Sequence, residues 1–394
     1  MIPFLPTKWS LFMNHILGRS YLPPYLVDHL YKESQCQKLK STLLHINELM
    51  SRGYSTEDKE HLKQLFTCSA RPGTNYERII RDAQEKAFLP NHTHSNLPIC
   101  SRSDLSLEPT YPSPDELHMP HEDYLIVMKE GDPAQPYTPV QIVYDSIGYV
   151  RQFYKEKLNI DKIFGCDSQI NAVVHFDKNY PNAFWNSQAI YFGDGDSIYF
   201  GPFYNDIDII AHELTHGFIT FTTDFDYIFQ SGALNESVAD VVGIMVKQYV
   251  ANETAAESNW LLGENLFINK AKAPALRSMA APGTAYRLSE TNRDPQVGHM
   301  RDYKNLSIFQ DNGGVHINSG IPNKAFYLLA TTLGGYSWEV AGQIWIRTMF
   351  DKTLSTRATF DDFAKATIRT ATEKFDHHVV NLTRKSWENV GIYV

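Results

Sequence analysis

The spacing of the apolar residues changes near the middle of the chain. Between residues 124 and 203, short apolar runs at 125–128, 170–176 and 189–201 have the length and the β-branched or aromatic composition of strands. Residues 143–158, between the first two runs, follow a helical period. Beyond residue 207 the pattern is mainly helical, in runs at 208–220, 235–250, 322–333, 338–350 and 359–375. We therefore predict an α+β fold in which a β-rich lobe precedes a helical lobe.

Two other stretches define the predicted domains. Residues 1 to about 75 carry helical-looking patterns and end in a Pro/Gly turn at 69–75, which indicates a separate N-terminal segment. Residues 91–123 are rich in Pro, Ser, Asp and His without a period, so they read as an exposed insertion whose histidines are solvated rather than metal-bound. The predicted parts are a segment at 1–75, a β-rich lobe at 76–221 that includes the insertion, and a helical lobe at 222–394.

Composition and charge exclude several classes of protein. The chain of 394 residues has a formal net charge of -9, which argues against a nucleic acid or an anionic membrane as its partner. No run of about 18 uninterrupted apolar residues is present, so no membrane-spanning helix is expected. The four cysteines form no CxxC pair. The N-terminal stretch is interrupted by Pro3, Pro6, Lys8 and His15, and no secretory signal is evident.

The segment His212-Glu213-Leu214-Thr215-His216 carries the clearest chemical signal. Two imidazoles four residues apart lie on one face of a helix, where both can bind a single ion, and Glu213 then lies beside the metal as a general base. Taken alone, the same pattern also fits two surface histidines on an amphipathic helix.

A second helical pattern, twenty residues further on, supplies a third ligand in Glu236. Two neutral imidazoles and one carboxylate leave a fourth position for water, which is the ligand count of catalytic zinc. Asp240 lies one turn beyond Glu236 and is placed to accept the remaining ring N–H of His212. A solvated helix glutamate is the plain alternative for Glu236 considered by itself.

A downstream cluster at 311–320, with the sequence DNGGVHINSG, predicts a constrained loop around an imidazole. Asp311 is placed to orient and charge His316, which would then donate a hydrogen bond to a developing oxyanion. Tyr227 is a second candidate donor, with a buried structural tyrosine as the alternative. An isolated loop histidine would otherwise be ordinary polar surface.

From about residue 124 to the C-terminus, the chain resembles the thermolysin-like M4 metallopeptidases, and most closely their protealysin branch. The resemblance covers about two-thirds of the chain and rests on motifs at 182–188 (NAFWNSQ), 192–196 (FGDGD), 212–217 (HELTHG), 231–243 (SGALNESVADVVG), 276–279 (LRSM) and 311–328. It implies a two-lobe fold with the HExxH helix between the lobes, and a zinc endopeptidase acting on peptides or proteins.

The resemblance also implies roles for individual residues. The zinc ligands, the base Glu213 and the oxyanion donors fall on matching positions. Asn182 and Ala183 match an edge strand that hydrogen-bonds an extended substrate. An apolar pocket on the leaving-group side of the scissile bond is implied by Phe203, Ile209, Leu276 and Arg277. We therefore expect cleavage before bulky hydrophobic residues.

Calcium is doubtful. Asp208 and Glu264 of the family's calcium cluster are retained, but Lys247, Asn259 and Leu261 stand where thermolysin has acidic residues. We expect no double-calcium site, with Lys247 either a built-in cation beside the two retained carboxylates or a solvated helix lysine. The insertion at 91–123 also departs from the family pattern.

The N-terminal segment resembles a propeptide. Residues 21–26 (YLPPYL) look like the PPYL motif of protealysin-like propeptides, in which Pro23, Pro24 and Tyr25 form a stiff region that docks on the catalytic domain. Residues 1–75 are therefore expected to be cut from a precursor, between Cys68 and Glu77; a permanent helical domain that aids folding is the alternative. The resemblance is compatible with cytoplasmic accumulation followed by release through a non-standard route.

Two competing functions remain open at this point. A catalytically silent zinc-binding interaction protein could share the fold, but it would have no need of Glu213, Tyr227 and His316 together. A metal-independent hydrolase would need a nucleophile signature such as GxSxG or a Cys–His pairing, and neither is evident.

Overall fold

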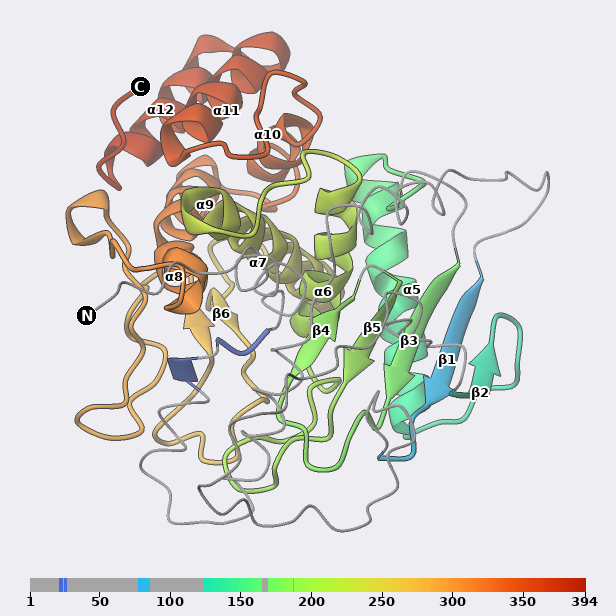
Figure 1. Ribbon diagram of the computed structural model, residues 1–394. Helices are drawn as coiled ribbons and strands as arrows, with labels where there is room; N and C mark the ends of the chain where they lie inside the picture. The colour runs from blue at the N-terminus through green and yellow to red at the C-terminus, as the bar shows by residue number, and fades with distance from the viewer. Residues whose placement is uncertain (1–20, 24, 27–76, 86–123, 165–168, 187) are drawn as a thin grey trace, which may run out of the picture.

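The structure is a computed structural model that describes residues 21–23, 25–26, 77–85, 124–164, 169–186 and 188–394. The predicted insertion at 91–123, the helical patterns of 27–75, Pro24 and all four cysteines lie outside the described residues. In the described part, a mixed sheet is followed by a helical region, which confirms the predicted α+β class (Figure 1).

Five strands form the main sheet in the order β2-β1-β3-β5-β4. β1, β3 and β5 run parallel, and the outer strands β2 and β4 pair antiparallel to their neighbours. Every residue of β3 and β5 is buried, as expected for apolar central strands that are covered on both faces. Strand bounds are β1 (Arg78–Asp82), β2 (Leu125–Lys129), β3 (Ile170–Val174), β4 (Ala183–Trp185) and β5 (Ala189–Phe192).

Helix α5 (Pro139–Leu158) covers one face of this sheet (Figure 1). It begins where the Thr138 side chain accepts a hydrogen bond from the amide of Gln141, with Pro139 in the first turn. It ends at Asn159, whose left-handed backbone (φ 56°) closes the last turn. Its buried apolar residues join the single hydrophobic core that runs from the sheet into the helical region.

The rest of the described chain is mainly helical. A two-stranded ribbon of β6 (Leu261–Leu262) and β7 (Arg277–Ser278) interrupts it, together with a 3-10 turn, η3 (Met300–Asp302). The helices are α6 (Ile207–Thr220), α7 (Phe229–Ala251), α8 (Asp311–Asn318), α9 (Gly320–Leu333), α10 (Ala341–Thr348), α11 (Phe360–Lys374) and α12 (His377–Glu388). Within the described ranges, no helix combines the length and the hydropathy that crossing a bilayer requires.

Helices α6 and α7 form the centre of the molecule, between the sheet and the remaining helices (Figure 1). Gly243 of α7 permits their close approach, because a Cβ at this position would lie 2.8 Å from the backbone oxygen of Asp208 in α6. Both helices are buried along most of their length, so polar side chains on their facing surfaces are removed from solvent.

Two segments differ from the predicted elements. Residues 193–201 were expected to continue a strand, but Oδ1 of Asp196 accepts the amides of Ile198, Tyr199 and Phe200 at 2.8, 2.8 and 2.9 Å and so folds them into a loop. The expected loop around His316 is helix α8, whose first turn is distorted by left-handed backbone at 312–314. Strand β1 was not predicted, since its five residues carry no alternating pattern.

Candidate active site

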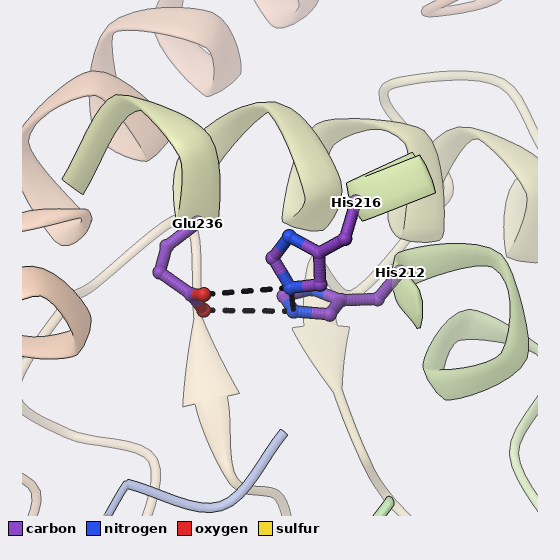
Figure 2. A group of neighbouring side chains, drawn as sticks. All are labelled: His212, His216 and Glu236. Carbon is purple, nitrogen blue, oxygen red and sulfur yellow. Dashed lines mark hydrogen bonds and ion pairs between the residues drawn. The ribbon is translucent and has the colours of Figure 1, made fainter. Parts of the chain in front are cut away.

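Three side chains with metal-binding atoms converge where α6 faces α7. The Nε2 atoms of His212 and His216 lie 3.0 Å apart, and the carboxylate oxygens of Glu236 lie 3.5 Å from the first and 3.4 Å from the second. Figure 2 shows both imidazoles and the carboxylate pointing toward one another. All three residues are at most 1% exposed. The fourth-residue spacing on α6 therefore places both imidazoles opposite a single carboxylate of α7.

These three residues fit a zinc ion. Zinc bonds of roughly 2.0–2.2 Å to nitrogen and oxygen require ligand atoms about 3.3 Å apart in a tetrahedral arrangement. The three ligand atoms all lie within 4.8 Å of one another, with the pairwise separations given above. The donor set, two imidazoles and one carboxylate, is that of catalytic rather than structural zinc.

The outer nitrogens of both imidazoles are also held. Nδ1 of His212 lies 2.9 Å from Oδ1 of Asp240, and Nδ1 of His216 lies 2.8 Å from Oδ1 of Asn235. Such contacts fix the ring orientation and leave Nε2 as the ligand atom. Burial lowers the pKa of His212, but its hydrogen bonds with Asp240 and Glu236 outweigh burial and raise that pKa to about 9. In the metal-free protein, a proton therefore competes with zinc at this imidazole.

Glu213 directly follows His212 in the sequence of α6. It has no hydrogen-bonding partner among the described residues. Both of its carboxylate oxygens are buried and unpaired there. Burial raises the pKa of Glu213 to about 8, against the opposing effect of the charge on His212. A buried carboxylate without a hydrogen bond does not stabilise the fold. It is a candidate for accepting and releasing a proton during catalysis.

Tyr227 and His316 reach the same centre from two other segments. The Tyr227 hydroxyl hydrogen-bonds to Glu236 and lies 3.2 Å from Nε2 of His316. Asp311 accepts hydrogen bonds from both the His316 ring (Nδ1, 2.5 Å) and the His316 amide (3.0 Å). Burial lowers the pKa of His316, but the charges of Glu236 and Asp311 outweigh burial and raise it. Two potential hydrogen-bond donors thus lie beside the three ligand side chains.

Tyr21 and Leu22 of the N-terminal segment lie against this centre. The Tyr21 amide donates to the backbone oxygen of Ala183 at 3.0 Å, and the Leu22 amide donates to Oδ1 of Asn182 at 2.8 Å. Both acceptors stand at β4, the edge strand of the sheet. The dark-blue trace of the described N-terminal residues lies between β4 and β6 in Figure 1. The two residues expected to bind an extended substrate therefore bind the chain's own N-terminal segment.

Arg277 joins the segment to the centre. Its Nε and Nη2 donate to Oδ1 of Asp240 at 3.1 and 2.8 Å, and its Nη1 donates to the carbonyl oxygen of Tyr21 at 3.1 Å. Burial lowers the pKa of Arg277, but the charge of Asp240 outweighs it and raises that pKa. The other expected pocket residues are all buried in the same hydrophobic core: Phe203, Ile209 and Leu276.

Sequence reasoning missed two residues of the site. Asn235 orients His216, and Asn323 of α9 donates from Nδ2 to Oδ2 of Asp240 at 2.9 Å. Asn235 directly precedes Glu236, so it could have been considered as a partner of a ligand. Nothing in the sequence places Asn323 near Asp240, because 83 positions separate them.

Lys247 occupies the region of the altered calcium cluster. Its ammonium group forms an ion pair with Glu264 and donates to the backbone oxygen of Leu261 at 2.7 Å. Oδ1 of Asn259 lies 3.4 Å from the same nitrogen. Burial and the neighbouring charge of Asp206 raise the pKa of Asp208 to about 7, while the charge of Lys247 opposes that rise. One fixed cation thus lies among these carboxylates.

Comparison with known proteins gives consistent matches. The chain matches the thermolysin metallopeptidase catalytic domain at residues 141–220 and the thermolysin metallopeptidase alpha-helical domain at residues 223–392. It is 38% identical to the protease PrtS of Photorhabdus sp. (strain Az29) over 379 residues, which are 95% of this chain and 92% of that protein. An extracellular metalloprotease of Pectobacterium carotovorum subsp. carotovorum is 37% identical over 95% of this chain and 96% of its own length.

A solved structure is similar over nearly the whole chain. The precursor of protealysin, a metalloproteinase from Serratia proteamaculans, superposes with a TM-score of 0.76 at 34% sequence identity. The match covers 95% of this chain and 99% of that chain.

Proposed function

Because the chain belongs to the thermolysin metallopeptidase family and is therefore a zinc metalloprotease, we propose that His212, His216 and Glu236 hold its zinc in an endopeptidase site. We further propose that this endopeptidase cleaves before bulky hydrophobic residues. The observation that carries the proposal is the convergence of three ligand atoms beside a buried, unpaired Glu213. A structural metal site has no use for that carboxylate.

The residues of the chain divide the chemistry between them. Zinc in this ligand set acts as a Lewis acid and makes water nucleophilic near neutral pH. Glu213 accepts the proton of the attacking water and delivers it to the leaving amine. Tyr227 and His316 donate hydrogen bonds to the oxyanion that forms on the substrate carbonyl. Losing one such donor is expected to lower turnover roughly 100- to 1,000-fold.

A catalytically silent zinc protein of the same fold is the competing proposal. Three groups that zinc binding alone does not need argue against it: the carboxylate of Glu213 and the side chains of Tyr227 and His316, all within one buried cluster.

The first test combines metal removal with two substitutions. The zinc-loaded protein should release peptides from casein, lose that activity with a chelator and regain it with added zinc. Glu213→Gln should keep about one zinc per chain yet lose at least 100-fold in kcat/KM, because an amide neither accepts nor delivers the proton. His216→Ala should instead lose the metal. Activity of Glu213→Gln within tenfold of the wild type, at full zinc content, would exclude this base.

We also propose that the chain is made as a self-processed zymogen. The support is that Tyr21 and Leu22 contact Asn182, Ala183 and Arg277, the residues proposed to bind substrate. The Tyr21 ring packs edge-on against His212, with centroids 5.0 Å apart. A segment tethered to its own enzyme has a high effective concentration, so contacts of this kind inhibit strongly until the tether is cut.

Tyr21 is held at both ends of its backbone. Its amide donates to the backbone oxygen of Ala183, and its carbonyl oxygen accepts a hydrogen bond from Arg277. The chain then turns, since the Leu26 amide donates to the Pro23 carbonyl at 3.0 Å. Pro23 restricts the backbone at that turn, which reduces the entropy lost when the segment docks.

A further inference from the structure

We propose that the pocket occupied by Tyr21 is a selective aromatic site that favours tyrosine over leucine as the substrate residue following the cleaved bond, with Gly263 as the residue that sets its depth. This inference rests on the proposed endopeptidase function and specifies its substrate class. It treats the described N-terminal segment as a bound ligand that reports the shape of the pocket.

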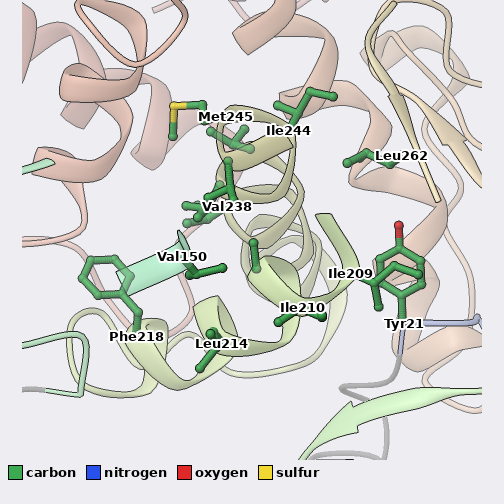
Figure 3. Close-up of a cluster of buried hydrophobic side chains, with 14 of the residues drawn as sticks. Tyr21, Val150, Ile209, Ile210, Leu214, Phe218, Val238, Ile244, Met245 and Leu262 are labelled. Carbon is green, nitrogen blue, oxygen red and sulfur yellow. The ribbon is translucent and has the colours of Figure 1, made fainter. Parts of the chain in front are cut away.

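The sides of the Tyr21 pocket suit an aromatic ring. The Arg277 guanidinium lies 4.3 Å from the centroid of the Tyr21 ring, within the range of a cation–π interaction. His212 packs edge-on against the same ring. Tyr21 belongs to the same cluster of buried apolar side chains as Ile209 and Leu262 (Figure 3). The Tyr21 side chain is 0% exposed, so the pocket surrounds it completely. Leucine would keep the apolar contacts but would have no π face for the guanidinium.

The far end of the pocket has room for the tyrosine hydroxyl because residue 263 is glycine. A Cβ built there would lie 3.2 Å from the Tyr21 hydroxyl oxygen and 3.4 Å from a ring carbon of Tyr21. It would also lie 3.2 Å from Cβ of Leu276, so little room is left for the pocket wall to move aside. A leucine side chain is shorter than tyrosine along this direction. Added bulk at residue 263 should therefore exclude the phenol more strongly than it excludes leucine.

Polar groups also lie at the far end. Oδ2 of Asp208 accepts the Gly263 amide at 3.1 Å, whereas Oδ1 of Asp208 is buried without a hydrogen bond among the described residues. The Tyr21 hydroxyl is likewise buried without a partner among them, and the charge of Asp208 acts on it. These two atoms do not hydrogen-bond to each other, so the contacts of the pocket distinguish aromatic from aliphatic residues and not tyrosine from phenylalanine.

The test measures substrate preference directly. Quenched fluorescent peptides that differ only in the residue after the cleaved bond are compared on the zinc-loaded full chain carrying Tyr21→Ala, which leaves the pocket free. We expect kcat/KM to be higher for Tyr and Phe than for Leu. Adding Gly263→Ala should lower the Tyr-to-Leu ratio of kcat/KM at least tenfold, which is the scale of a lost methylene-sized space.

A matched control separates pocket depth from backbone strain. Gly263 and Gly131 both have left-handed backbone, with φ of +69° and +86°, but a Cβ at Gly131 would meet nothing within 4 Å. Gly131→Ala should therefore carry the strain of alanine in this conformation without altering the Tyr-to-Leu ratio. If Gly131→Ala shifts that ratio as much as Gly263→Ala does, strain rather than space sets the preference, and the inference is overturned.

A second readout does not depend on peptide hydrolysis by this enzyme. In the Glu213→Gln background, the N-terminal segment is probed with an unrelated protease. Tyr21→Phe should protect the segment nearly as well as Tyr21, whereas Tyr21→Leu and Tyr21→Ala should be cut at least tenfold faster. Equal protection by Leu and Tyr would overturn the aromatic preference even if Gly263→Ala fails to fold.

The outcomes also distinguish this inference from the proposed function. If no peptide is cleaved by zinc-loaded protein that has lost its N-terminal segment, the endopeptidase proposal fails. If peptides are cleaved but leucine is preferred to tyrosine, the endopeptidase proposal stands and only the aromatic pocket is rejected.

Discussion

Asn235 lies outside the proposed ligand set but contacts one of its members. It holds Nδ1 of His216 at 2.8 Å, while its own Nδ2 donates to the backbone oxygen of Phe225 at 3.3 Å. The amide is therefore fixed at both ends. Without it, the His216 ring would rotate more freely and the neutral form with Nε2 available would lose its preference.

We expect Asn235→Ala to weaken zinc binding about 10- to 100-fold, the usual effect of losing a partner that orients a ligand. Competition with a chromophoric chelator measures this affinity. Asn235→Asp restores the acceptor oxygen and should recover most of it, which a purely structural role in packing would not predict. Wild-type zinc affinity in Asn235→Ala would contradict the role assigned to the residue.

At this scale, the sequence identifies ligands better than it identifies their partners. His212 and His216 were predicted as ligands from helical spacing, since residues four apart on one helix share a face, and Glu236 was predicted from the second helical pattern and the ligand count of catalytic zinc. Asn235 and Asn323 act across helix contacts, and those contacts depend on how closely α6, α7 and α9 approach. The roles of Tyr227, His316 and the pocket residues remain predictions, supported by their positions around one buried centre.

At the scale of elements, Lys247 links α7 to the β6 region. Its side chain is 21% exposed and that of Glu264 is 31% exposed, so the ion pair is partly shielded from solvent. The charge of Lys247 opposes the effect of Asp206 on the pKa of Asp208, so this ammonium group partly offsets the repulsion between the two carboxylates.

We therefore expect thermal unfolding of the zinc-saturated protein to be nearly indifferent to added calcium. Differential scanning calorimetry with and without millimolar calcium measures this. Lys247→Ala should lower the melting temperature and make it more responsive to calcium, because the carboxylates then lack a cation. A rise of several degrees on adding calcium to the unaltered chain would show that a calcium site persists.

The loops that follow β3 and β5 are joined by a pH-sensitive contact. Nδ1 of His175 lies 2.9 Å from both carboxylate oxygens of Asp194, and Tyr204 donates to the same carboxylate at 3.1 Å. The hydrogen bond with Asp194 raises the pKa of His175 above its ordinary value of 6.5. The histidinium form is therefore favoured by folding.

The sign of the pH dependence follows from that raised pKa. The contribution to stability is complete below pH 6.5 and is lost as the pH rises through the pKa of His175 in the folded protein. Asp194→Asn should thus lower the free energy of unfolding more at pH 5.5 than at pH 9, by about 0.5–1 kcal/mol for a partly exposed pair. Urea unfolding at both pH values measures the difference. An equal loss at both would show that the pair is not charged.

Sequence patterns predicted long elements well and short ones poorly. The helical periods of α5, α6 and α7 span several turns, so chance matches are few. The strand expected at 193–201 failed because Asp196 collects three successive amides, a local interaction that hydrophobicity does not report. Helix α8 was taken for a loop because DNGG at its start is turn-forming, and its left-handed residues do distort the first turn.

At the scale of the whole molecule, the described N-terminal segment joins the two structural regions. Leu22 bonds to Asn182 at the sheet, while Tyr21 bonds to Arg277 in the β7 strand of the helical region. The segment therefore spans the site instead of lying beside it. Sequence predicted that residues 21–26 dock on the catalytic part, but the contacting residues could not be paired without the fold.

We expect the purified full-length chain to gain activity only as it loses its N-terminal segment. Mass spectrometry and peptidase activity are followed together, alongside Glu213→Gln. The wild type should shorten by about 70–76 residues with a matching rise in activity, from the turn signal at 69–75. The variant should stay intact, because the proposed processing is autocatalytic and needs Glu213. Full activity in molecules that all retain Met1 would reject the zymogen.

The contact between Tyr21 and its pocket has an evolutionary consequence. The proposed inhibitory segment and the pocket that it occupies are encoded in one gene. A mutation that changes the pocket to accept other substrates therefore also changes how tightly the pocket binds residue 21. A lineage that widens or narrows the pocket must change its own N-terminal residue in step, or else release an unrestrained protease during synthesis. The residue at position 21 should therefore match the residue that the mature enzyme prefers after the cleaved bond.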